Sequence, residues 1–157
     1  MLFTAHIIVG SAVGLAAGEP GLALAAGFVS HHIIDALPHS DSGSFGGSVQ
    51  NILSSKRLIR WVWFDVAAGS LILAVLIFWQ LPYWKLVFFG AVGGVLTDVI
   101  DNSPFWSVKL RRIFPFNFFH RFHEKFHFTI QNKKYIWIGW ITQIILIVLS
   151  LYYILIK

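Results

Sequence analysis

The chain has 157 residues, of which 57% are hydrophobic and 12% are charged, and its mean hydropathy is +0.71. Charged residues make up about a quarter of an ordinary soluble domain, so this composition excludes that class and indicates an integral membrane protein. The net charge of +5 is compatible with nucleic-acid binding, but basic residues of a membrane protein more often mark cytoplasmic loops and lipid headgroups, so we expect no nucleic-acid partner.

Five apolar segments are long enough to form helices. About 20 apolar residues cross about 30 Å of hydrocarbon, a length that the last segment reaches and the first two do not. Glu19 and Gly21 flank Pro20, which is placed to open a helix, so we expect the first two segments to form a tight hairpin that need not cross the whole bilayer. The sequence predicts an all-α polytopic protein with about five transmembrane helices in a single domain, 1–157. The segments are 2–17, 21–37, 61–81, 84–100 and 135–156.

Small residues recur every four positions in the first segment, at Gly10, Gly14 and Gly18. Such a stripe allows another helix to approach closely. His6 continues the same stripe, so we expect the packing seam and the polar site to coincide.

The basic residues are distributed unevenly. If all five segments cross the membrane, ten of the twelve Lys and Arg residues lie on one side, in the loop 38–60 and the segment 102–134. Cytoplasmic loops carry such an excess, so we expect this side to be cytoplasmic and the membrane to be a bacterial inner membrane. The same count places every polar candidate residue on the cytoplasmic side and leaves the opposite halves of the helices almost purely apolar.

A weak internal repeat with an offset of 66 residues supports a layout of two hairpins. In this repeat Gly27 matches Gly93 and Asp35 matches Asp101.

The segment 103–134 includes a stretch, 116–128, in which Phe and His residues recur at helical spacing. We expect an amphipathic helix here that lies in the membrane interface, with Phe119, Phe122 and Phe126 in lipid and the histidines pointing inward.

Three pairs of ionisable residues have the spacing of metal ligands on one helix face. His31 and Asp35 are four residues apart, as are His123 and His127, and Asp98 precedes Asp101 by three. Each pair alone is a weak signal, but burying so many carboxylates without a cation costs several kcal/mol. The chain has no cysteine, and His and Asp ligands suit one or two ions of Zn, Mn or Fe. The candidate ligands are His6, His31, Asp35, His39, Asp98, Asp101, His123 and His127.

Several polar residues allow more than one interpretation. His6 is either a ligand or a histidine bonded to a neighbouring helix. Asp65 is a ligand, a partner that orients a histidine, or an ion-pair partner of Arg57 or Arg60, and the second is preferred. The basic residues Lys109, Arg111 and Arg112 are expected to contact lipid headgroups, or else a substrate phosphate.

Four strings of the chain resemble those of a known group. They are Thr4-Ala5-His6, the stretch from Ser30 to His39, the stretch from Thr97 to Asp101, and His123, His127 and Gln131 before the last segment. The chain resembles small uncharacterised bacterial membrane proteins that are similar to the membrane-bound metal-dependent hydrolases. The resemblance covers most of the chain, and the string Ser-His-x-x-x-Asp-x-x-Pro-His is its most specific element. It implies that the eight candidate ligands are the shared polar positions.

These observations predict a hydrolase that acts on a phosphoester or ester of a membrane lipid or lipid-linked substrate. The metal would activate water, and Asp101 or Asp65 would act as the general base. Two alternatives remain: a transporter of divalent metal or protons, and a scaffold subunit without catalytic activity.

Overall fold

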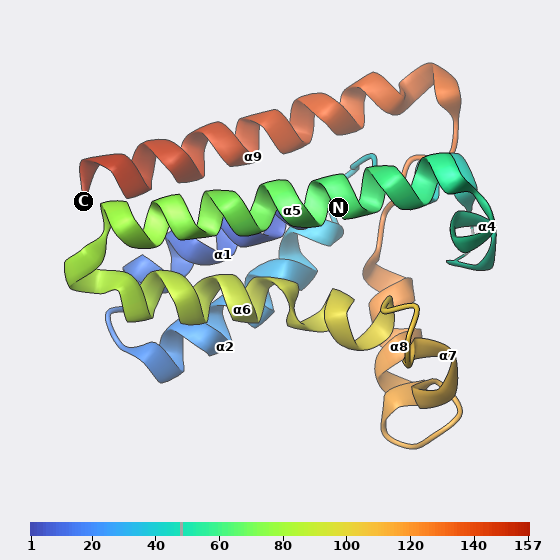
Figure 1. Ribbon diagram of the computed structural model, residues 1–157, viewed down its shortest axis with the longest axis horizontal. Helices are drawn as coiled ribbons and strands as arrows, with labels where there is room; N and C mark the ends of the chain where they lie inside the picture. Colours follow the sequence, from blue (N-terminus) through green and yellow to red (C-terminus); the bar gives the residue numbers. More distant parts are fainter. Residues whose placement is uncertain (48) are drawn as a thin grey trace.

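The computed structural model of the protein describes residues 1–47 and 49–157 (Figure 1). Long helices run side by side, most of the short ones lie near one end of the bundle, and η1 joins two long helices at the other end. The long helices are α1 (Phe3–Ala17), α2 (Pro20–Asp35), α5 (Lys56–Trp79), α6 (Trp84–Asp101) and α9 (Ile136–Ile156). The short elements are α3 (Gly43–Gly46), α4 (Val49–Ser54), η1 (Leu81–Tyr83), α7 (Ser107–Leu110), α8 (Phe116–Phe126) and η2 (Lys133–Tyr135).

The predicted hairpin between the first two segments is confirmed. Gly18 ends α1 with φ of 75°, a left-handed conformation that glycine adopts without strain. Glu19 then caps α2, because its carboxylate accepts hydrogen bonds from the backbone N–H groups of Gly21 and Leu22.

Glycines let α1, α2 and α6 pack against one another, as the small-residue stripe predicts. A Cβ atom at Gly90 would meet the backbone of Gly10, and one at Gly94 would meet the carbonyl oxygen of His6. The close approach brings the backbone of α6 against the helix that carries His6. The packing seam and the polar site therefore coincide at Gly94.

Three helical stretches within the described residues are long and apolar enough to cross a membrane: Lys56–Trp79, Leu81–Asp101 and Lys133–Ile156. α1 is apolar but has only 15 residues, and α2 has 16. The membrane character is therefore supported, and the count of about five spanning helices is not confirmed.

α5 begins five residues before the predicted start at Trp61, because the Ser55 hydroxyl accepts a hydrogen bond from Leu58 N–H and caps the helix.

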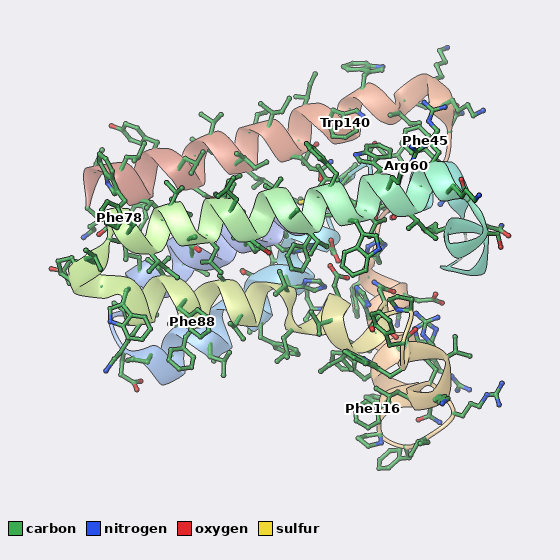
Figure 2. The ribbon with its side chains drawn as sticks, viewed as in Figure 1. Phe45, Arg60, Phe78, Phe88, Phe116 and Trp140 are labelled. Atoms are coloured by element: carbon green, nitrogen blue, oxygen red, sulfur yellow. The ribbon has the colours of Figure 1, made fainter. Side chains whose placement is uncertain are left out.

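Large apolar side chains cover the outer faces of the bundle (Figure 2). Phe64 and Phe78 on α5 are 71% and 75% exposed. α9 exposes a similar row, which includes Leu149 and Tyr152. Exposed apolar surface of this extent is typical of helices that contact lipid.

α1 begins beside the middle of α5, not at its end (Figure 1). The Asp65 carboxylate accepts hydrogen bonds from the backbone N–H groups of Phe3 and Thr4, at 2.7 and 3.2 Å, and from the Thr4 hydroxyl. Asp65 therefore caps α1 from a neighbouring helix, which satisfies N–H groups that have no partner within α1. Because Asp65 lies about 14 Å along α5 from Lys56, the start of α1 lies well inside the bundle.

Candidate metal centre

Polar side chains converge where α1 begins and α2 and α6 end. Two groups of His and Asp residues could hold a metal ion in the part of the chain that the structure describes. In each group the ligand atoms lie within 4.8 Å of one another. The first group is His31, Asp35, Asp98 and His123, and the second is Asp35, His39 and His127.

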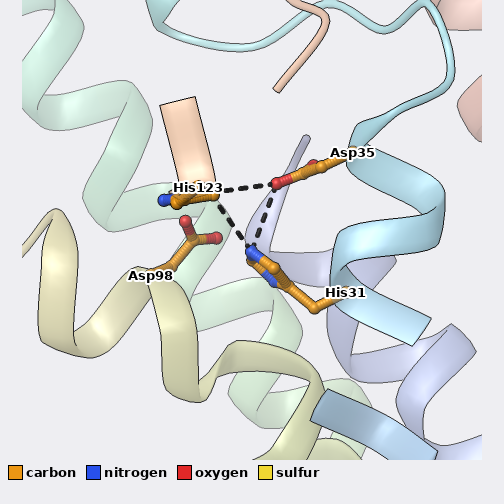
Figure 3. Close-up of side chains that lie close together, drawn as sticks. All are labelled: His31, Asp35, Asp98 and His123. Atoms are coloured by element: carbon orange, nitrogen blue, oxygen red, sulfur yellow. Dashed lines mark hydrogen bonds and ion pairs between the residues drawn. The ribbon is translucent and has the colours of Figure 1, made fainter. Parts of the chain in front are cut away.

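The first group joins three helices (Figure 3). His31 and Asp35 come from one face of α2, Asp98 from α6 and His123 from α8. The Nε2 atom of His31 lies 3.2 Å from Asp35 Oδ2 and 3.3 Å from His123 Nε2. His31 and Asp35 are almost completely buried.

The second group depends on extended backbone. His39 follows α2, and a parallel β-bridge pairs it with Thr129. The backbone N–H of His39 donates to Phe128 O, and the N–H of Ile130 donates to His39 O. These hydrogen bonds bring His39 beside His127, with ring centroids 4.7 Å apart.

The prediction that His123 and His127 share a helix face is wrong. α8 ends at Phe126, and His127 has φ of −92° and ψ of 103°, which is extended backbone. The two rings are still close, with centroids 5.2 Å apart. They belong to different groups, however, because the chain turns away from the helix axis between them.

The four histidines of the two groups are oriented alike. In each ring Nδ1 is hydrogen-bonded to an oxygen at 2.8 or 2.9 Å, and Nε2 points toward the Asp35 carboxylate at 3.2 to 3.8 Å. The Nδ1 partners are Gly94 O for His31, Leu37 O for His39, Asp101 Oδ2 for His123 and Thr129 Oγ1 for His127. Metal-binding histidines are held in this way, with Nε2 left free for the ion.

The arrangement is suited to a cation between the side chains. A carbonyl oxygen can only accept, so Nδ1 of His31 carries a proton and the Nε2 of the neutral ring has a lone pair. That lone pair faces the oxygens of Asp35, which also only accept when ionised. Two nitrogens bound to one tetrahedral zinc ion lie about 3.3 Å apart, which is the separation of Nε2 in His31 and His123.

Asp101 lies outside both groups and contacts the first of them through His123. Its Oδ2 accepts hydrogen bonds from Nδ1 of His123 and of His120, each at 2.9 Å, and its Oδ1 accepts one from Nε of Arg111 at 3.0 Å. A carboxylate behind a histidine ligand fixes the ring and makes its nitrogen more basic. In this geometry Asp101 orients His123.

His6 and Asp41 border the two groups. The Nε2 of His6 lies 3.2 Å from Asp35 Oδ1 and 3.7 Å from Asp98 Oδ2, and neither ring nitrogen has a hydrogen-bond partner within the described residues. Asp41 was not among the predicted ligands, yet its Oδ2 lies 3.4 Å from Nε2 of His39 and 3.7 Å from Nε2 of His127. Its position two residues after His39 was the sequence signal for it.

The local electrostatics differ between the two groups. Burial disfavours a charged His123, but its hydrogen bonds to the Asp101 and Asp35 carboxylates and the nearby negative charge outweigh burial and raise the pKa of His123 to about 9. Burial and the nearby Met1 amine lower the pKa of His127 to about 4. That amine lies 2.8 Å from Asp35 Oδ1, so it adds positive charge on the side of the second group.

A cavity of about 810 Å³ opens beside the site. Asp41, Asp98, His123, His127 and Arg111 border it, together with apolar side chains of α5 and of the segment after α6. Asp65 and Asp101 also line it. The other two predicted headgroup contacts, Lys109 and Arg112, are exposed and are not part of the cavity wall.

Comparison of the chain with protein-family models, with curated proteins and with solved structures found no match.

Proposed function

We propose that the protein is a membrane-embedded hydrolase that uses two divalent metal ions to cleave a phosphoester or ester of a lipid or lipid-linked substrate. The observation that carries the proposal is the orientation of four histidines whose Nε2 atoms face a single buried carboxylate, Asp35. Asp35 belongs to both groups and would contribute a ligand to each. Zn, Mn and Fe all suit such a set of His and Asp ligands.

When bound, such ions lower the pKa of water and stabilise the charge that develops on the scissile oxygens. The residues around them would have separate roles. His31, His123 and Asp98 would hold one ion, and His39 and His127 the other, while Asp101 orients His123. His6 contacts Asp35 and Asp98 from α1, which makes it a further ligand or a partner of these carboxylates.

Asp41 is the general base that the geometry favours. It borders the cavity, and its Oδ2 faces the Nε2 atoms of His39 and His127, so it would accept a proton from water beside the second group, although Ser44 N–H and the Thr129 hydroxyl also donate hydrogen bonds to it. The predicted bases Asp101 and Asp65 are less suitable. Asp101 contacts Nδ1 of His123, behind the ring and away from Nε2, and Asp65 caps α1.

The membrane setting favours a lipid as the substrate. Helices of membrane length form part of the cavity wall, and the basic residues of the loop 38–60 and the segment 102–134 favour a cytoplasmic position for this end of the bundle. A hydrolase at this location would act on headgroups or phosphates at the inner leaflet.

The test is a hydrolysis screen with metal analysis of the same samples. Protein purified in detergent is supplied with Zn²⁺, Mn²⁺ or Fe²⁺ and incubated with phospholipids and lipid-linked phosphates in mixed micelles. We expect turnover that Asp41→Asn reduces strongly while the bound metal stays at two ions per chain. Glu19→Gln, at the hairpin turn away from the site, is the matched control and should behave as wild type.

A protein that folds without metal, is indifferent to chelators and hydrolyses none of these substrates would contradict the proposal. Flux of divalent metal into proteoliposomes that Asp98→Asn blocks would instead support a transporter.

A further inference from the structure

The wall of the cavity is apolar on two sides. On α5, Val62, Trp63 and Val66 line it over about one turn of helix. Val99, near the end of α6, and Phe105, in the segment that follows, line it as well. α5 and α6 are both long enough to cross a membrane, so part of the apolar wall comes from helices of membrane length.

The apolar wall continues to the outer surface of the protein. Trp63 is 54% exposed and Phe105 is 70% exposed, although both line the cavity. α5 and α6 diverge from their shared turn toward the end that contains the site (Figure 1). The apolar wall of the cavity therefore reaches the outer surface near the membrane-length helices.

The inner end of the cavity is polar and includes a cation. Arg111 lines the cavity and is held in place by hydrogen bonds to the carboxylate and backbone oxygen of Asp101. Its Nε and Nη2 make these contacts and one to Asn102, whereas Nη1 has no hydrogen-bond partner within residues 1–47 and 49–157. An arginine whose Nη1 group is not already hydrogen-bonded is suited to bind a phosphate oxygen.

We infer that the cavity binds an amphiphile with a phosphate headgroup, which enters from the bilayer between α5 and α6. The phosphate contacts Nη1 of Arg111 beside the metal groups, and the hydrocarbon chain lies against Val62, Val66 and Val99. The inference rests on the proposed metal site; it narrows the substrate to one with a phosphate and adds where its headgroup and chain lie. A water-soluble phosphoester would leave the apolar wall without a partner, whereas a lipid chain buries it.

Photo-crosslinking tests where the chain lies. The probe is dodecyl phosphate with a diazirine at the end of its chain, added to metal-loaded protein in nanodiscs of zwitterionic lipid. We expect crosslinks in residues 59–66 and 99–106, which excess dodecyl phosphate suppresses and dodecanol does not. Crosslinks that spread evenly over α5 and α9, or that dodecanol suppresses equally well, would overturn the inference.

A pair of substitutions on one helix provides the matched control. Val66→Trp fills the cavity, and we expect it to reduce crosslinking by about tenfold, the loss expected when about two methylene groups are no longer buried. Val75→Trp adds the same ring at an exposed position of α5 outside the cavity and should have no effect. The bound metal should be unchanged in both variants, and equal crosslinking in the two would contradict the inference.

The outcome separates this inference from the proposed function. Specific crosslinking by a protein that hydrolyses nothing would support the binding site and contradict the hydrolase. Hydrolysis of methyl and dodecyl phosphoesters at the same rate, unaffected by Val66→Trp, would support the hydrolase and contradict the lipid cavity.

Discussion

The two metal-ligand groups share Asp35 but are built differently. The first group takes its ligands from three helices, and its histidines are fixed by Gly94 O on α6 and by the Asp101 carboxylate. The second takes both histidines from extended segments that meet in one isolated β-bridge. Helix packing therefore makes the first group rigid, whereas a few backbone hydrogen bonds hold the second. We expect the first group to bind metal more tightly.

The largest effect should come from the residue that the groups share. Asp35→Asn removes a negative charge from both groups, so we expect both ions to be lost. Activity should fall by more than the roughly 10- to 100-fold that results from removing a residue hydrogen-bonded to a metal ligand. Elemental analysis and circular dichroism of the purified variant would check this. Retention of one ion would show that Asp35 does not bridge the groups.

Removal of one histidine from each group tests whether the groups are separate. His31→Ala should abolish binding at the first group and His39→Ala at the second, so each variant should keep one of two ions. The ratio of metal to protein measures this directly. If either substitution releases both ions, the groups form one cooperative site and the comparison between them fails.

A smaller effect is expected from the residues behind the histidines. Asp101→Asn weakens the acceptor of the His123 Nδ1–H, so metal affinity of the first group should fall by about 10- to 100-fold. Titration of the apoprotein with Zn²⁺ would show one weakened and one unchanged binding step. Weakening of both steps would indicate that Asp101 acts on the fold as a whole.

Thr129→Val is the corresponding change in the second group. It keeps the shape of the side chain but removes the oxygen that bonds Nδ1 of His127 at 2.9 Å, and the backbone of the β-bridge remains. We expect about a tenfold loss of affinity at the second group alone. The same Zn²⁺ titration measures it, and an unchanged second step would show that the hydroxyl does not orient the ring.

Local patterns allowed some of these features to be predicted. His31 and Asp35 share a helix face because four residues are about one turn, and the glycine seam follows from the same periodicity. The hairpin turn and the apolar segments are local properties too. The prediction for His127 failed because the same helical spacing was extended past the end of α8 at Phe126.

The sequence alone determined the membrane class, the helical segments and the kinds of side chain that could bind metal, because composition and helical periodicity depend only on neighbouring residues. The tertiary structure decided which nitrogen of each histidine faces Asp35, since the Nδ1 partners of His31 and His123 lie on another helix. It also gave Asp65 its role as the cap of α1 and brought Asp41 beside His127. These contacts join residues far apart in the chain, so they exist only once the helices have packed.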